Sequence, residues 1–175
     1  GHEMALTTVF SGLIEKLKYD NEKLKYFHFD FHKNCSRMRF ENVNILLDTI
    51  EDIRTKMGYF EVSLNENKSI LKCKSIINRQ LGVFRTNCID CLDRTNVVQS
   101  MLAWRTVSAM LNDQETQIED TSINFYKKNL EYEFKNIWAN NADFLSVQYS
   151  GTPALKTDFT RYLCACSIKS WCTYH

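Results

Sequence analysis

The chain has 175 residues, a length that suits one domain with a hydrophobic core. Hydrophobic residues make up 44% of it and charged residues 25%, which is ordinary for a globular protein and argues against disorder. The formal net charge of +1 gives the molecule no electrostatic bias toward nucleic acid, so we expect no nucleic-acid partner.

The cysteines and the first residues bear on the cellular compartment. Seven cysteines form an odd set without regular spacing, and the opening residues show neither a basic leader nor an apolar signal region. We therefore expect free thiols in a reducing compartment. No apolar run approaches the roughly 20 residues that cross a bilayer, so we expect no transmembrane segment and a chain that by itself is soluble and cytoplasmic.

Hydrophobic spacing in the first third of the chain predicts two helices with a strand between them. Apolar residues recur at helical intervals over 6–24 and predict a helix. Aromatic and polar residues alternate over 26–32 and predict a strand. Apolar residues three and four apart predict an amphipathic helix over 43–57, which Gly58 ends.

The rest of the chain continues the alternation of helix and strand. The elements expected there are, in chain order, a strand over 59–64, an exposed polar connection over 65–80, a short apolar strand over 81–85, a helix over 95–111, a solvated loop over 112–121 and a helix over 123–149. This order favours an α/β fold. Because the chain has only one proline and five glycines, no flexible linker divides it.

The segment 85–96 carries the chemistry. It reads Arg-Thr-Asn-Cys-Ile-Asp-Cys-Leu-Asp-Arg-Thr-Asn and lies between a predicted strand and a predicted helix, where backbone N–H groups converge on an anion. Five residues separate Cys88 from Arg94, so the loop amides can surround a phosphate while the guanidinium binds two of its oxygens. This positive environment favours the thiolate of Cys88, a nucleophile that forms a cysteinyl phosphate without a metal. Thr95 is expected to donate its hydroxyl to the sulfur.

The general acid is a separate question, because the loop contains both Asp90 and Asp93. Two ionised carboxylates facing the site would repel a phosphate, so a carboxyl group that points inward should hold a proton. A protonated aspartate beside the leaving oxygen is what proton donation requires. We expect Asp90 to be the acid and Asp93 to point outward and fix the loop, with Asp30 as the next candidate for the acid.

Three blocks of this sequence, in this order, resemble the Sac (suppressor of actin) family of phosphoinositide phosphatases. The central block is the segment 85–96, and the upstream block is Phe29-Asp30-Phe31-His32. The downstream block comprises residues 136–143, 148–152 and 154–161. The resemblance extends over about residues 26–161.

The resemblance implies a partial cysteine-phosphatase-like catalytic core, built from a strand, the Cys-x5-Arg loop and a helix. It implies a phosphoinositide lipid at a membrane surface as the partner, and hydrolysis of phosphate from the inositol ring of phosphatidylinositol monophosphates. The 4-phosphate is the expected substrate and the 3-phosphate a second one. Within the family the endoplasmic-reticulum and Golgi lipid phosphatases look most similar, which implies the cytosolic face of those membranes. No cofactor is implied.

Other residues are expected to line the substrate site. Within the loop these are Asn87, Ile89, Cys91, Leu92 and Asp93. Further along the chain, Lys156 and Arg161 are expected to contact lipid phosphates, and a solvated surface is almost as good an interpretation of these two cations.

Two other classes of site share parts of this pattern. Cys88 and Cys91 form a Cys-x-x-Cys pair, which also occurs in zinc and redox sites, but no second pair lies at zinc spacing. Tyrosine phosphatases share the Cys-x5-Arg spacing but usually have a histidine before the cysteine and glycine in the loop. Here Asn87 precedes the cysteine, and the loop has no glycine.

After Arg161 the sequence departs from the family pattern. Where the family continues with a basic stretch similar to Thr-Gly-Lys-Arg-Thr, this chain reads Tyr162-Leu163-Cys164. We therefore expect a partial Sac catalytic domain over 1–161 and a divergent tail over 162–175. The alternative function is that of a catalytically inactive, truncated fragment that binds phosphoinositide or a partner protein through the same loop.

Overall fold

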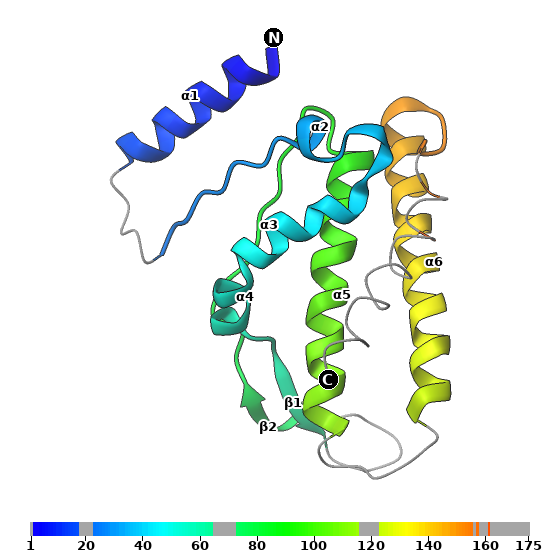
Figure 1. The fold of residues 1–175 in the computed structure, drawn as a ribbon. Coiled ribbons are helices and arrows are strands. Elements are labelled where there is room, and N and C mark those ends of the chain that lie inside the picture. Colours follow the sequence, from blue (N-terminus) through cyan, green and yellow to red (C-terminus); the bar gives the residue numbers. More distant parts are fainter. Residues whose placement is uncertain are drawn as a thin grey trace. The chain divides into compact units, whose positions relative to one another are not determined.

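The computed structural model describes residues 2–17, 23–64, 73–115, 123–155, 157 and 161 (Figure 1). The described chain combines helices with one small sheet, which is consistent with the expected α/β class. It divides into two units, Gly1–Arg39 and Phe40–His175, which are described separately. The expected tail 162–175 lies outside the described residues.

The first unit contains the helix α1 (His2–Lys16), the short helix α2 (Phe31–Asn34) and the 3-10 turn η1 (Ser36–Met38). The helix expected over 6–24 is therefore present but begins earlier, and it ends in a turn where Leu17 N donates to Leu13 O at 3.0 Å. Residues 18–22 lie outside the described part of the chain.

The strand expected over 26–32 is wrong. Residues 24–30 have no regular structure, and α2 begins at Phe31. The Asp30 carboxylate accepts a hydrogen bond from Lys33 N at 2.9 Å, which caps the first turn of this helix. A strand also needs a neighbouring strand for its backbone groups, and an aromatic–polar alternation does not supply one.

The second unit begins with the 3-10 turn η2 (Phe40–Asn42) and two helices, α3 (Val43–Thr49) and α4 (Glu51–Met57). The single helix expected over 43–57 is thus interrupted at Ile50, whose φ and ψ are −100° and 3°. Ile50 is buried, at 6% exposed, and hydrogen bonds continue on both sides of it, from its N–H to Leu46 O at 3.1 Å and from Arg54 N to its carbonyl at 2.9 Å. Gly58 ends α4 as expected, at φ 62° and ψ −156°, which a residue with a side chain rarely adopts.

The sheet is an antiparallel pair of β1 (Glu61–Leu64) and β2 (Cys73–Asn78). The first strand confirms the strand expected over 59–64. The exposed connection expected over 65–80 is wrong for 73–78, because these residues pair with β1, from Leu64 with Cys73 to Glu61 with Asn78. Every residue of β2 is exposed. Because the strand buries little surface, its sequence resembles that of an exposed loop. Residues 65–72 lie outside the described part.

The segment that leads into the loop before α5 is not the strand expected over 81–85. Its exposure alternates from residue 81 to 89, as in a strand, but no ladder forms with any described residue. Its start is fixed to the end of α4 instead: Leu81 N donates to Met57 O at 2.8 Å. A Cβ on Gly82 would approach the Met57 side chain to 3.0 Å, so the two segments pass closely.

Two long helices, α5 (Asp93–Glu115) and α6 (Ile123–Ser150), lie side by side and frame the site (Figure 1). The helix expected from Thr95 begins two residues earlier, and it continues to 115, so the loop expected over 112–121 is helical in its first part. Residues 116–122 are outside the described part. The helix expected over 123–149 is confirmed. Among the described helices, none is long and apolar enough to cross a membrane.

The core of this unit lies between α3, α5 and α6. Its buried apolar side chains are Phe40, Val43, Leu47, Ile50, Val97, Met101, Ala139 and Ala142. Beside it, Arg105 on α5 donates to Asp48 Oδ1 at 2.6 Å and to Asn44 Oδ1 at 3.0 Å on α3, and lies 3.4 Å from Glu51 Oε2 on α4. Apolar packing and this ion-pair network together hold α3 and α4 against α5.

Candidate active site

The loop before α5 closes on itself over four residues. Cys88 N donates to the Cys91 sulfur at 3.2 Å, and the Cys91 thiol donates back to Cys88 O at 3.3 Å. Asp90 Oδ1 accepts from Leu92 N at 3.2 Å and lies 3.8 Å from the Cys88 sulfur. The structure therefore brings the predicted nucleophile, the predicted acid and two more predicted loop residues into contact.

Cys91 closes this loop at a conformational cost. Its φ is 58°, in the left-handed region that residues with a Cβ rarely occupy. Backbone strain of this kind costs about 1–3 kcal/mol and persists only where the surroundings enforce it. Here the paired contacts of the Cys91 sulfur with the Cys88 backbone keep the tight turn.

Arg94 and Thr95 follow in the first turn of α5, a helix of 23 residues whose start carries the positive end of its dipole. Thr95 is only 9% exposed, and its hydroxyl oxygen has no hydrogen-bond partner among the described residues. A buried hydroxyl without a partner is destabilising unless something else binds it. Thr95 therefore has a free donor at a helix start that favours anions.

Asp93, the first residue of α5, contacts the turn that follows α6. Its Oδ1 accepts from Leu155 N at 3.1 Å, and Asp143 Oδ1 on α6 accepts from the adjacent Ala154 N, also at 3.1 Å. The two carboxylates thus bind successive amides of one turn. The Asp93 carboxylate is engaged with that turn, whereas the Asp90 carboxylate is engaged within the loop.

Asn96 joins the start of α5 to α6 from the inside. It is 3% exposed, donates to Trp138 O at 3.2 Å and accepts from Asn141 Nδ2 at 3.2 Å. On the other side, Gln99 donates to Thr86 Oγ1 at 2.8 Å, which ties the beginning of the loop to the second turn of α5. The loop therefore begins and ends on the same helix.

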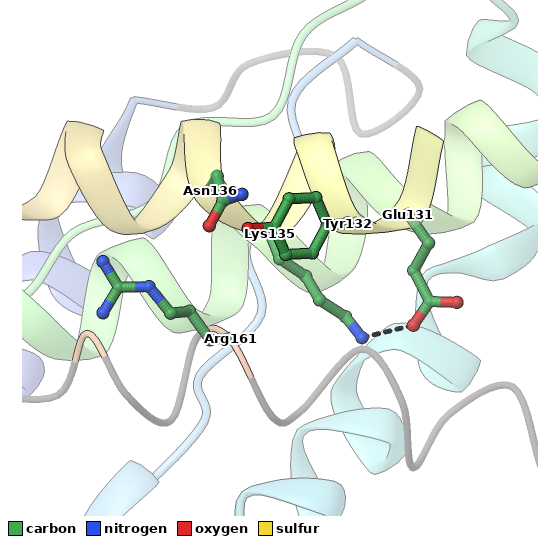
Figure 2. A pocket seen from close by; sticks show the side chains of 5 residues that line it. All are labelled: Glu131, Tyr132, Lys135, Asn136 and Arg161. Carbon is green, nitrogen blue, oxygen red and sulfur yellow. Dashed lines mark hydrogen bonds and ion pairs between the residues drawn. The ribbon is translucent and has the colours of Figure 1, made fainter. Parts of the chain in front are cut away.

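Of the other predicted residues, the structure describes Arg161 and Asp30. Arg161 lines a pocket of about 290 Å³ along α6 (Figure 2), with Glu131, Tyr132, Lys135 and Asn136. In that pocket Lys135 forms an ion pair with Glu131 one turn away. Lys156 lies outside the described residues. Asp30, the second candidate for the acid, belongs to the first unit, where it caps α2.

The chain matches many curated proteins over nearly its whole length. It is 42% identical to phosphatidylinositol-3-phosphatase SAC1 of Drosophila melanogaster over 92% of this chain and 26% of that protein. It is 42% identical to phosphoinositide phosphatase SAC6 of Arabidopsis thaliana over 93% of this chain and 26% of that protein. The chain belongs to the Sac family. It is also 37% identical to the Saccharomyces cerevisiae SAC1 phosphatase over 92% of this chain and 25% of that protein.

The Sac-family chain spans about a quarter of the length of these relatives. No protein-family profile matches the chain, and no solved structure matches it. The assignment therefore rests on whole-chain similarity to proteins that carry phosphoinositide phosphatase names, together with the three sequence blocks.

Sequence reasoning did not single out the residues that fix the site of this Sac-family chain in place. Asn96, Gln99 and Asp143 are polar positions on helices, where solvent exposure is the usual outcome. Only for Asn96 did its position in the helix indicate burial. It adjoins Val97 and lies one turn before Ser100, and all three side chains are on the buried face of α5. The partners of Asp143 and Asn96 lie at least 11 residues away, so spacing alone could not reveal them.

Proposed function

We propose that this Sac-family chain carries the chemistry of a phosphoinositide phosphatase, removing phosphate from the inositol ring of phosphatidylinositol monophosphates at a membrane surface. The 4-phosphate is the proposed substrate and the 3-phosphate a second one, at the cytosolic face of endoplasmic-reticulum and Golgi membranes. The observation that carries the proposal is the contact of Cys88 with Asp90 in a loop that opens α5, in a chain whose relatives are named phosphoinositide phosphatases.

In the first step, the Cys88 thiolate attacks phosphorus and the bond between phosphorus and the inositol oxygen breaks. The leaving oxygen takes a proton from Asp90, which gives a free inositol hydroxyl and a cysteinyl phosphate. The 3.8 Å separation of the Cys88 sulfur from Asp90 Oδ1 supports this division of roles. The Cys88 thiol is the donor in this contact, and the proposal is that its proton passes to Asp90 before attack, which leaves a thiolate nucleophile and a protonated acid.

In the second step, water attacks phosphorus and the bond between phosphorus and sulfur breaks, releasing inorganic phosphate. The Asp90 carboxylate takes the proton from that water and is ready for the next cycle. Thr95 is proposed to donate its hydroxyl to the departing sulfur, a role supported by its buried and unpartnered Oγ1 among the described residues. Neither step needs a metal.

Binding of the phosphate is proposed for Arg94 and the loop from Asn87 to Asp93, with Lys156 and Arg161 as further contacts to lipid phosphate. A guanidinium suits this task because its planar donors match two phosphate oxygens. The N–H groups at the start of α5 add a fixed positive potential. The partial Sac domain is proposed to extend over 1–161.

Phosphate release from a soluble short-chain phosphatidylinositol phosphate tests the proposal. Cys88→Ser should lower turnover by at least about 1,000-fold, because an alcohol at neutral pH is a poor substitute for a thiolate. Cys73→Ser is the matched control, since Cys73 is an exposed cysteine on β2, and it should retain wild-type turnover. Equal turnover by wild type and Cys88→Ser would refute the proposal. A panel of ring isomers then decides between the 4-phosphate and the 3-phosphate.

The role of Asp90 has its own test. Asp90→Asn should lose activity on phosphatidylinositol phosphate but keep near-normal turnover on an aryl phosphate, whose leaving group needs no proton. Asp93→Asn is the comparison, because its carboxylate bonds Leu155 N. Equal loss on both substrates by Asp90→Asn would remove Asp90 from the role of acid.

One observation favours a second candidate, an inactive chain that binds phosphoinositide or a partner protein. Two loop amides, those of Cys88 and Leu92, already donate to the side chains of Cys91 and Asp90. An anion that uses these amides has to displace both contacts. Phosphoinositide binding by wild type without phosphate release would select this candidate.

A further inference from the structure

The turn after α6 is fixed at three points and is therefore a well-defined feature beside the catalytic loop. Gly151 N donates to Val147 O at 3.0 Å with φ 77°, which ends the helix. Ala154 N and Leu155 N then donate to the carboxylates of Asp143 and Asp93. Because Asp93 begins α5, the backbone of Leu155 is held at the point where the catalytic loop becomes helix.

The side chain of Leu155 is turned to solvent at this point. It is 89% exposed, more than any other large hydrophobic side chain in the described part of the chain. Ile89, which adjoins the nucleophile Cys88 in the loop, is 59% exposed. Arg85, four residues before Ile89, is also exposed. Two aliphatic side chains and a cation thus face water around the loop, although its neighbouring positions on α5, Thr95 to Val97, are buried.

We propose that Leu155 and Ile89 form an apolar rim that enters the interfacial layer of a lipid bilayer when the loop binds its substrate. This inference rests on the proposed function. A phosphoinositide keeps its acyl chains in the bilayer, so the protein surface around the phosphate site has to approach the membrane. Aliphatic side chains there leave water on contact, and the exposed Arg85, four residues before Ile89 in the chain, favours an anionic leaflet. The hydrogen bonds that Asp93 and Asp143 accept from the backbone fix the turn, so no ordering of that backbone opposes insertion.

The experiment compares two substrates with the full 175-residue chain. One is phosphatidylinositol 4-phosphate in vesicles of phosphatidylcholine and phosphatidylserine, and the other is its short-chain form below the critical micelle concentration. Leu155→Gln keeps the backbone N–H that Asp93 binds but removes the apolar surface. It should lower kcat/KM on vesicles about five- to tenfold, mainly through KM, because partial burial of one leucine side chain in the interfacial layer corresponds to a factor of about that size. On the soluble substrate it should stay within about twofold of wild type.

Ile77→Gln provides the control, since Ile77 is 61% exposed on β2 and should change neither rate. Equal loss on both substrates by Leu155→Gln would place Leu155 in the site or in a protein interface and overturn the rim. An unchanged rate on vesicles would also overturn it.

Different outcomes contradict the proposed apolar rim and the proposed function. If wild type releases no phosphate from either substrate, the proposed function fails and the same pair of variants is compared by vesicle sedimentation. Weaker sedimentation of Leu155→Gln than of Ile77→Gln supports the rim, and equal sedimentation overturns it.

Discussion

The loop over residues 88–92 and the start of α5 adjoin in sequence but are stabilised in opposite ways. In the loop, the side chains of Asp90 and Cys91 contact backbone or sulfur no more than three residues away. At the start of α5, Asp93 and Asn96 bind groups that lie 42 to 62 residues further along the chain. The residues proposed for chemistry thus depend on local contacts, whereas the residues that hold the helix depend on tertiary ones.

This difference predicts a separation of effects on substitution. Changes in the loop should alter turnover and leave the free energy of unfolding nearly constant, because each removes contacts within a few residues. Changes at the buried start of α5, or at the α3–α5 interface, should lower the free energy of unfolding, because each leaves partners on another helix unsatisfied.

Asn96→Ala should have the largest effect on stability. Removing this 3% exposed side chain leaves Trp138 O and the Asn141 amide without their partner, which should lower the free energy of unfolding by about 2 kcal/mol. Urea denaturation followed by circular dichroism measures the change. Asn140→Ala, an exposed asparagine on α6, is the control and should change it by less than about 0.5 kcal/mol. A small effect of Asn96→Ala would show that α5 and α6 are held by apolar packing alone.

Arg105→Met should have the next largest effect. The substitution keeps much of the aliphatic volume but removes the bonds to Asn44, Asp48 and Glu51. Because Asp48 is largely exposed, solvent screens part of the interaction, and the free energy of unfolding should fall by only about 1 kcal/mol. Lys56→Met, an exposed lysine on α4, should leave it unchanged. Similar midpoints for both variants would contradict a stabilising network.

Acid should weaken the same network through Glu51. The hydrogen bond from Arg54 lowers the pKa of Glu51 below its ordinary 4.5, with burial opposing and the charges of Arg54 and Arg105 adding to the decrease. Above about pH 4.5 both folded and unfolded chains carry the ionised group, so its stabilisation is complete. As the pH falls below this value, Glu51 takes up a proton in the unfolded chain before it does so in the folded chain. The stabilisation is therefore lost progressively until the pH has passed the lower pKa of the folded chain. Wild type should therefore lose stability more steeply than Glu51→Gln below pH 4.5 in urea titrations; parallel curves would contradict this assignment.

Cys91→Ala should have the smallest effect on stability, below about 0.5 kcal/mol, because the contacts that it removes are local and the backbone strain that they enforce at φ 58° can relax with them. The freed Cys88 amide should change phosphate affinity instead, which equilibrium binding of inorganic phosphate measures. Cys35→Ala is the contrast, since Cys35 is 5% exposed and its loss should lower stability. A large decrease in the free energy of unfolding of Cys91→Ala would contradict the distinction between a locally stabilised loop and a helix start that depends on tertiary contacts.

The elements that sequence reasoning placed well are those whose pattern is long and periodic. The helix over 123–149 and most of the helix from Thr95 follow from apolar spacing over many turns. The strand expected over 26–32 failed because the Asp30 cap favours a helical turn there. The hairpin partner β2 was missed because all its residues are exposed and only the pairing with β1 makes it a strand.

The sequence by itself determined the order of chemical groups, from Cys88 to Arg94 and Thr95, and the family to which the chain belongs. Spacing along a backbone suffices for that, because these groups are close in the chain before any folding. Tertiary structure alone decided that Asp93 and Asp143 bind one turn and that Asn96 joins two helices. Such contacts depend on which helix faces meet when apolar side chains are buried, and no local pattern encodes the partner.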